Sequence, residues 1–438
     1  MTTVPEKVEQ AYGSLPAGWR LEKLKFFADV RNSNVDKTIA DGEEPIRLCN
    51  YTDVYYNDRI TPDLEFMQGG ATEAEIEKFQ LKRGQVIVTK DSESWDDIGI
   101  PALVAEDMPG VVCGYHLSVF EPNGVDLDGG YLAWLCRSEP LNDQFKLGAN
   151  GVTRFGLGQY PMKNAFIALP PLDTQRRIAR FLDEKTARID GLIEKKRALL
   201  DRLAEKHQAL ITRAVTKGLN PAAPMKPSGI DWLGDIPAHW EVLPLKRVLR
   251  SSTYGVSASL EPAGGVAVLR MGNLVGGEID LGDLRFLDEV DENLLLEAGD
   301  VVFNRTNSLN LVGKTSIFRG DADFPVSLAS YLVRFRFTDR YLPEYANFVM
   351  GTEVLLALAR TLALPSIGQA NLNPSRYAQI EFPIPPVAEQ SGIVGYLVEQ
   401  TSRIATIWDR IDTSRQQLAD YRAALVTAAV TGQIVELA

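Results

Sequence analysis

The chain has 438 residues, 45% of them apolar, and a net charge of −12 at pH 7. This length suits two or three domains, and no apolar run is long enough to span a membrane. Three cysteines and three histidines stand far apart without metal-ligand spacing, so we expect a cytoplasmic protein with no metal site and no membrane partner. The acidity alone argues against a nucleic-acid binder.

The first module is expected to span residues 1–172. Residues 45–50 have the composition of a short strand, and residues 81–88 (LKRGQVIV) indicate a glycine turn followed by a buried strand. Gly, Asn, Asp and Pro interrupt much of the remainder, for example at residues 148–158. We therefore expect an α+β module with a mixed, mostly antiparallel sheet.

Residues 173–217 are predicted to form one long helix. The run has no proline, Asp173 is a candidate N-cap, and Gly218 is a candidate C-terminal stop. The segment carries 12 Lys and Arg against 7 Asp and Glu, so a basic element lies within an acidic chain. Apolar residues recur in steps of three, four or seven, which predicts a narrow coiled-coil stripe. The stripe comprises Leu182, Ile189, Ile193, Leu200, Leu203, Leu210 and Ala214.

A proline-rich linker, residues 218–234, is expected to join this helix to a second module, residues 235–387. Trp232 and Leu233 should bring the chain back into folded structure. The second module repeats landmarks of the first: LEAGDVVF at 296–303 matches the Gly84 segment, and GDIPAHW at 234–240 matches GSLPAGW at 13–19. The two modules therefore share a framework.

A second long helix is expected at residues 388–431, followed by a tail at 432–438. Shifted by 215 residues, the segment 384–434 aligns without a gap on 169–219 and is identical at 17 of 51 positions. The heptad phase is the same in both copies, including Trp408 and Leu418 of the second. Two narrow apolar stripes can bury themselves against each other, although each helix could instead pack on its own module.

Polar loops occupy equivalent places in both modules. One follows the Gly84 strand or the Gly299 strand, and the other precedes the Pro-Pro pair before each helix. Arg, Lys, Asn and Gln can bind base edges, and hydroxyl groups can bind phosphates. Taken singly, each loop is more typical of a solvated turn, but the matched pairs predict DNA contact. The candidates are Lys90, Ser92, Arg154, Gln159, Tyr160, Lys163, Asn304, Arg305, Asn307, Ser366, Gln369 and Asn371.

Catalytic motifs are present only as near misses. The segment VGKT at 312–315 ends like a P-loop, but Ser308 stands where its first glycine is required. The segment FGLG at 155–158 precedes a strand and does not join a strand to a helix. We therefore expect a recognition or scaffold protein and not an enzyme.

The repeated pattern around the Pro-Pro pairs resembles the specificity subunits of type I restriction–modification systems. In residues 170–189 and 385–404, Pro-Pro is followed at the same spacing by Gln, Ile, an aromatic-Leu pair, Thr and Arg-Ile. The AVTKGL ending at 214–219 and the MKPSGI segment at 225–230 are similar to the same family. The resemblance covers essentially the whole chain, except that the second helix ends in Thr-Gly-Gln where Thr-Lys-Gly is typical.

This resemblance implies that each module is a target recognition domain that reads one half of a split site in double-stranded DNA. It implies that the long helices form an antiparallel coiled coil, related by a pseudo-two-fold repeat, which spaces the domains and docks two methyltransferase subunits. Restriction and translocase subunits would complete the assembly. S-adenosylmethionine, ATP and Mg²⁺ would be bound by those partners, and this non-catalytic chain would bind no cofactor.

Two other functions remain open at this point. A free-standing DNA-binding regulator would bind a discrete site alone, so copurification with a methyltransferase would separate it from a specificity subunit. A coiled-coil adaptor would not touch DNA, and a DNA pull-down of the assembled complex would exclude it.

Overall fold

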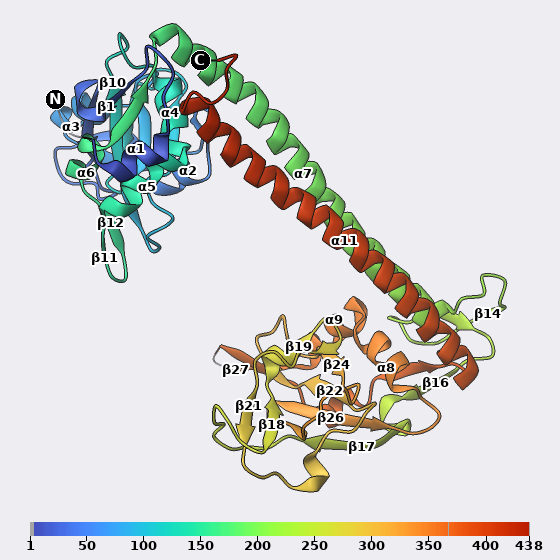
Figure 1. Ribbon diagram of the computed structural model, residues 1–438. Helices are drawn as coiled ribbons and strands as arrows, with labels where there is room; N and C mark the ends of the chain where they lie inside the picture. The colour runs from blue at the N-terminus through green and yellow to red at the C-terminus, as the bar shows by residue number, and fades with distance from the viewer. Residues whose placement is uncertain (1–3, 367, 438) are drawn as a thin grey trace. The chain divides into compact units, whose positions relative to one another are not determined.

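The computed structural model describes residues 4–366 and 368–437, and the chain divides into two compact units (Figure 1). Unit 1 comprises Met1–Arg197 and Thr413–Ala438, and unit 2 comprises Ala198–Asp412. Each unit contains a sheet-rich part and a portion of both long helices, α7 (Leu172–Lys217) and α11 (Val387–Val430). Among the described helices, none combines the length and the apolar character that crossing a membrane requires.

Unit 1 is built on a mixed sheet with strand order β2-β10-β6-β8-β4. Its central strand β6 has the sequence VIVT and is buried at every residue, as the apolar run after Gly84 predicts. Gly84 has a φ of +84°, a conformation that glycine adopts without strain, and it turns the chain into β6. Three smaller sheets, β5-β3-β9, β11-β12-β7 and β1-β13, complete the unit.

The strands of unit 1 are β1 (Arg20–Lys23), β2 (Ala28–Asn32), β3 (Glu44–Cys49), β4 (Arg59–Ile60), β5 (Met67–Ala71), β6 (Val86–Thr89), β7 (Asp91–Ser92), β8 (Pro101–Val104), β9 (Val111–Cys113), β10 (Leu117–Pro122), β11 (Ala149–Gly151), β12 (Phe155–Leu157) and β13 (Phe166–Leu169). Its shorter helices are α1 (Glu6–Tyr12), α2 (Tyr51–Tyr55), α3 (Glu73–Phe79), α4 (Gly129–Arg137), α5 (Glu139–Gly148) and α6 (Gln159–Asn164), with a 3₁₀ turn at Leu24–Phe26.

Unit 2 repeats this plan with the sheet β17-β26-β22-β24-β20-β19, whose buried strand β22 follows Gly299 as β6 follows Gly84. Its smaller sheets β21-β18-β25, β27-β28-β23 and β16-β29 correspond in order to those of unit 1. The strand pairings therefore confirm the predicted duplication and the mixed sheets. An added pair, β14-β15, has no counterpart among the described strands of unit 1.

The strands of unit 2 are β14 (Met225–Pro227), β15 (Asp235–Pro237), β16 (Glu241–Pro244), β17 (Leu249–Tyr254), β18 (Val266–Leu269), β19 (Leu274–Val275), β20 (Glu278–Ile279), β21 (Arg285–Leu287), β22 (Val301–Asn304), β23 (Thr306–Asn307), β24 (Thr315–Ile317), β25 (Val326–Leu328), β26 (Leu332–Phe337), β27 (Leu364–Ser366), β28 (Gln369–Asn371) and β29 (Glu381–Ile384). Its helices are α8 (Pro343–Met350), α9 (Glu353–Leu362) and α10 (Pro374–Tyr377), with 3₁₀ turns at Leu245–Arg247, Met271–Asn273 and Glu292–Leu294.

The long helices pack against each other in opposite directions within each unit. In unit 1 the start of α7, at Leu182, shares a hydrophobic core with the end of α11, at Val426. In unit 2 the end of α7, at Ile211, shares a core with the start of α11, at Leu397. These contacts confirm that the two helices pair and that the pairing is antiparallel.

The predicted stripe on α7 is buried at Leu182, Ile189, Ile193, Leu200 and Ala214. The stripe on α11 is less covered, because Trp408 is 37% exposed. The C-terminal stop of α7 is confirmed, since Gly218 has a φ of +70° and its N–H donates to the carbonyl of Ala214.

One cap prediction was wrong, and one predicted linker contains regular structure. Helix α7 begins at Leu172, so Asp173 lies inside the first turn and the N–H of Gln175 donates to the Pro171 carbonyl. Strand β14, which lies within residues 218–234, pairs with β15 just after them, and the Lys226 ammonium donates to the Trp240 carbonyl at 2.7 Å. These contacts hold part of the linker against unit 2.

The repeated glutamine after each Pro-Pro pair anchors the start of each long helix. Buried Gln175 accepts the N–H of Asp128 at 2.9 Å and donates to the Pro170 carbonyl at 2.9 Å. Its counterpart Gln390 accepts the N–H of Leu342 at 2.8 Å and donates to the Pro385 carbonyl at 2.8 Å. A side chain with both a donor and an acceptor is needed to satisfy these buried backbone groups, which explains why glutamine occurs in both copies.

Candidate nucleic-acid interface

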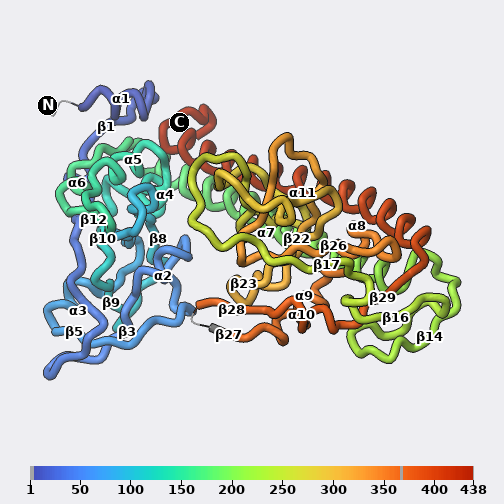
Figure 2. The backbone as a smooth tube through the Cα atoms, turned by 90° about the horizontal axis from the view of Figure 1, so that it is seen from below, coloured from blue at the N-terminus to red at the C-terminus, as the bar shows by residue number. Residues whose placement is uncertain are grey.

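The first candidate loop leaves the central strand of each unit and enters a small sheet that we call the loop sheet. The loop sheet of unit 1 consists of β11, β12 and β7, and that of unit 2 consists of β27, β28 and β23. Figure 2 labels β12 of the first and all three strands of the second. Ser92 on β7 pairs with Phe155 on β12, directly after Arg154. Asn307 on β23 pairs with Ala370 on β28. The structure therefore brings the two predicted loops of each unit together.

Lys90 and Arg305 hold the same place in the two loop sheets, 215 residues apart. The N–H of Leu157 donates to the Lys90 carbonyl at 2.6 Å, and that of Leu372 donates to the Arg305 carbonyl at 2.8 Å. The Lys90 N–H itself donates to the His116 carbonyl at 3.0 Å, and the Arg305 N–H donates to the Tyr331 carbonyl at 3.1 Å. All four bonds join residues whose numbers differ by 215 between the units, so both cations sit on one repeated backbone frame.

Each cation also lies against a tyrosine ring. The Lys90 nitrogen is 4.6 Å from the ring centroid of Tyr115, and the Arg305 guanidinium carbon is 5.2 Å from that of Tyr254. Both tyrosines are exposed. Cation–π contact and partial burial restrict these side chains before any ligand arrives, which lowers the entropic cost of binding a phosphate or a base.

Arg154 lies beside a histidine that was not among the candidates. Its guanidinium is 3.3 Å from His116 Nδ1, and the same nitrogen is 2.9 Å from the Asp91 carboxylate. Ser92, in contrast, is buried, and its hydroxyl oxygen accepts the N–H of Ser94 at 3.1 Å. Arg154 is exposed and can reach a ligand, whereas the buried Ser92 stabilises the turn that leads to Ser94.

The candidates on α6 form a separate group. Gln159 donates through its side chain to the Val30 carbonyl on β2, and the Lys163 ammonium is 4.0 Å from Asp29 of the same strand. Tyr160 is 78% exposed. These contacts tie α6 to the outer strand of the main sheet, so only Tyr160 projects freely.

In unit 2, Asn304 is buried and its side-chain oxygen has no hydrogen-bond partner among the described residues. Asn371 accepts the Thr306 hydroxyl at 2.6 Å, and the side-chain oxygen of Asn307 accepts the N–H of Ser308 at 2.8 Å. Gln369 is exposed. The backbone of Ser366 pairs with Gln369, and the side chain of Ser366 lies outside the described part of the chain.

A tyrosine cluster in unit 1 also lies at this surface and was missed. The rings of Tyr51 and Tyr55 stack with centroids 5.3 Å apart, and Tyr56 meets Tyr55 edge-on at 5.0 Å. The Tyr55 hydroxyl donates to Asp97 at 2.7 Å, and this bond raises the pKa of Tyr55 to about 12. Burial and then Asp97 raise the pKa of Tyr51, whose hydroxyl also bonds Ser92. The tyrosine-rich run at residues 51–56 was the available clue.

The described residues contain no group of three or more His, Cys, Asp or Glu side chains that could hold a metal ion. The site instead offers cations, amides and aromatic rings beside carboxylates such as Asp91. Such a set can bind a polyanion and base edges by hydrogen bonds and stacking.

Comparison with known proteins agrees with this arrangement. Residues 35–202 match the type I restriction modification DNA specificity domain. The chain is 22% identical to the type I restriction enzyme EcoKI specificity subunit of Escherichia coli (strain K12), over 96% of this chain and 90% of the relative. It is 24% identical to the MjaX specificity subunit of Methanocaldococcus jannaschii, over 41% of this chain and only 44% of that relative.

Two solved structures share the fold. A chain from a structural study of complex assembly and conformational transition of the type I R-M system has a TM-score of 0.74 at 16% identity, covering 95% of this chain and 99% of that chain. The HsdS subunit from Thermoanaerobacter tengcongensis has a TM-score of 0.53 at 16% identity, covering 97% of this chain and 100% of that chain. The structures share the fold, and the domain match together with the similarity to the EcoKI subunit along nearly the whole chain shows that the chain belongs to the DNA specificity subunits of type I restriction–modification systems.

Proposed function

We propose that each unit reads one half of a split target in double-stranded DNA, and that the loop sheet of each unit forms the centre of the contact. The observation that supports this best is the repeated frame that holds Lys90 and Arg305, with the same pair of backbone hydrogen bonds in both units. A repeated frame with different surrounding side chains suits two domains that dock on DNA alike but recognise different bases.

Within this proposal the candidate residues have two roles. We assign DNA contact to Lys90, Arg154, Tyr160, Arg305 and Gln369, because Arg154, Tyr160 and Gln369 are exposed and the half-buried cations Lys90 and Arg305 lie at the entry to the loop sheets. Those that are buried or bonded internally position the loops: Ser92, Gln159, Lys163, Asn304, Asn307 and Asn371. Tyr115 and Tyr254 stack against the cations and offer faces for bases or sugars. Ser366 stays a predicted contact.

The chain is the non-catalytic, DNA-specifying component of a type I complex, and S-adenosylmethionine and ATP belong to the modification and restriction subunits. We further propose that two methyltransferase subunits dock on α7 and α11, that restriction subunits join them, and that Mg²⁺ is bound there. The expected domains are residues 1–172 and 235–387, the helices 173–217 and 388–431, the linker 218–234 and the tail 432–438. The complex would work in the cytoplasm, where its DNA lies.

A module exchange tests the proposal. Residues 20–168 are replaced by the same region of another family member, and the methylated sequence is determined with the complete modification complex. We expect one half of the target to change and the other half to stay. A change in both halves, or in neither, contradicts the assignment of one half-site to each unit. The reciprocal exchange of the second module is the matched control and should change only the other half.

A further inference from the structure

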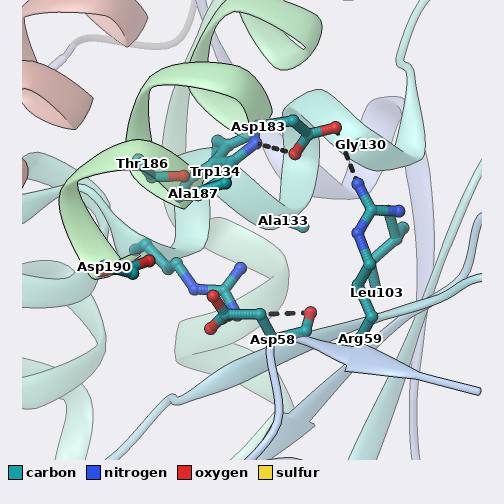
Figure 3. Close-up of a pocket in the computed structure, with 11 residues that line it drawn as sticks. Asp58, Arg59, Leu103, Gly130, Ala133, Trp134, Asp183, Thr186, Ala187 and Asp190 are labelled. Carbon is teal, nitrogen blue, oxygen red and sulfur yellow. Dashed lines mark hydrogen bonds and ion pairs between the residues drawn. The ribbon is translucent and has the colours of Figure 1, made fainter. Parts of the chain in front are cut away.

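A small pocket of about 170 Å³ in unit 1 lies where α4, β4 and α7 meet (Figure 3). Two guanidinium groups approach the ring of Trp134 there, Arg137 at 5.2 Å and Arg422 at 5.8 Å from its centroid. Arg137 pairs with Asp58 at 2.8 Å, and Arg422 pairs with Asp190 at 2.8 Å. Unit 1 thus fills this junction with its own arginines, an aromatic face and carboxylates.

Unit 2 has a cavity at the equivalent place, but its lining differs. The 215-residue shift aligns Arg422 with His207 and Asp190 with Ala405. The matching helices α4 and α8 align Trp134 with Phe348 and Arg137 with Gly351. The aromatic face is kept, whereas both arginines are replaced. The resulting cavity has a volume of about 660 Å³, within the range of ligand sites.

Four polar side-chain atoms that line this cavity are buried and lack a hydrogen-bond partner among the described residues. They are His207 Nε2, Gln208 Oε1, Thr315 Oγ1 and Asn347 Oδ1. The Asn347 amide is oriented by its nitrogen, which donates to the Gly277 carbonyl at 2.8 Å and leaves the oxygen as an acceptor. Buried polar atoms without protein partners are costly, so several in one cavity favour a polar group that fills it.

The chemistry of these atoms selects the ligand. The amide oxygens of Gln208 and Asn347 can only accept, and His207 can accept because burial lowers its pKa and favours the neutral ring. Glu344 adds a carboxylate to the lining and Lys314 adds an ammonium, while Glu278 is paired with Arg319 at 2.6 Å. A guanidinium group has five N–H donors and no acceptor, and it stacks on aromatic faces such as that of Phe348.

We propose that the cavity of unit 2 binds an arginine side chain of a partner subunit, in the place where unit 1 uses its own Arg137 and Arg422. The choice of a protein donor is supported by α11, which lines the cavity at Val398 and carries further exposed apolar side chains. Val398 is 45% exposed and Trp408 is 37% exposed. The identity of the donor as a modification subunit rests on the proposed function, whereas the guanidinium chemistry does not.

The first test uses the full-length chain alone and N-acetyl-L-arginine amide as the probe. The chain has three histidines, so the imidazole NMR signals of His207 can be assigned with the His207→Gln variant. We expect a saturable shift of the His207 signals, and at least tenfold weaker binding of N-acetyl-citrulline amide, which is neutral. No shift, or equal binding of the two amides, overturns the proposal.

Two variants exclude misfolding as the explanation. His207→Arg supplies a guanidinium from α7, at the position that Arg422 of α11 occupies in unit 1, and should abolish probe binding without lowering the melting temperature. Val398→Asp restores the carboxylate that Asp183 provides in unit 1, and should tighten probe binding about tenfold. His239→Gln, at a histidine that pairs with Glu389 away from the cavity lining, is the matched control and should leave binding unchanged. Unchanged affinity in Val398→Asp together with retained binding in His207→Arg contradicts the assignment.

The second test asks where the arginine comes from. Adding the modification subunit should displace the probe from the wild-type chain in proportion to complex formation. If the complex forms and the probe stays bound, a partner arginine does not occupy the cavity and the proposal fails. If no complex forms while the probe binds, the proposed function fails instead, together with the donor assignment.

Discussion

The hydroxyl of Tyr131 on α4 shares its proton between the carbonyl of Ala168, 3.0 Å away, and the carbonyl of Val430, 3.3 Å away at the end of α11. In unit 2 the hydroxyl of Tyr345 on α8 donates to the carbonyl of Val215 near the end of α7, at 2.8 Å. The last carbonyls of a helix have no partner within the helix, so each tyrosine caps the end of a long helix. Each unit is therefore completed by the end of the helix that follows the other module in sequence.

Removing these hydroxyls should lower the stability of the corresponding unit. We expect Tyr131→Phe and Tyr345→Phe each to lower the free energy of unfolding by about 1–2 kcal/mol, because a buried carbonyl loses its donor. Urea denaturation measures the change. Tyr396→Phe, at an exposed tyrosine of α11, is the control and should stay within about 0.5 kcal/mol of the wild type. Equal stabilities in all four proteins would show that the capping bonds contribute nothing.

The cations of the loop sheets should govern DNA affinity. Arg305→Ala and Arg154→Ala should each weaken binding of the assembled complex, by about 1–3 kcal/mol for a base contact, with relaxed specificity at one position. A phosphate contact should weaken all sequences alike and lower the salt slope by about one. Binding is measured by titration of labelled duplexes at several salt concentrations. Arg340→Ala, which removes an exposed ion pair with Glu241, is the matched control, and unchanged affinity in both test variants would remove these residues from the interface.

The long elements could be predicted from the sequence because their physical cause is local and repeated. The stripe from Leu182 to Ala214 persists over many turns, and the same phase recurs 215 residues later. The buried strands after Gly84 and Gly299 are short, but each combines a glycine turn with an apolar run. These local patterns favour the helices and strands without depending on contacts to distant parts of the chain.

The sequence predicted loops that the fold brings together in each unit, but not the contacts of their side chains. Strands β7 and β23 have two residues each, and they form only because distant segments pair with them. Whether Ser92 faces the core or the solvent depends on its register with Phe155, which no local pattern encodes. The pairing of Arg137 and Arg422 with Trp134 could likewise not be predicted, because these residues are far apart in the sequence and meet only after the helices pack.

The helix pairing should depend on its buried stripe. Ile189→Asp places a carboxylate in the contact between α7 and α11, where it has no partner, and should lower the free energy of unfolding by at least about 2 kcal/mol. Leu192→Asp, three residues away at a 47% exposed position, is the matched control and should cost under about 1 kcal/mol. Thermal denaturation and copurification with the modification subunit give the readouts. Full stability and assembly of Ile189→Asp would contradict the coiled-coil pairing.

His207 should make the stability of the chain depend on pH. Burial lowers its pKa below the ordinary value of 6.5, so the unfolded chain takes up a proton at this residue before the folded chain does. Between the lowered pKa and 6.5 the unfolded state therefore binds more protons, and the free energy of unfolding must fall as the pH falls. The stabilising contribution is complete above about pH 7.5 and is lost progressively as the pH drops through 6.5 toward the folded pKa.

Carboxylates titrate at lower pH in every variant, so the informative quantity is the difference between wild type and His207→Gln in urea denaturation at pH 7.5 and pH 5.5. We expect the wild type to lose more stability than His207→Gln over this interval. The same loss in wild type and His207→Gln would show that the imidazole in the cavity is as easily protonated as in the unfolded chain.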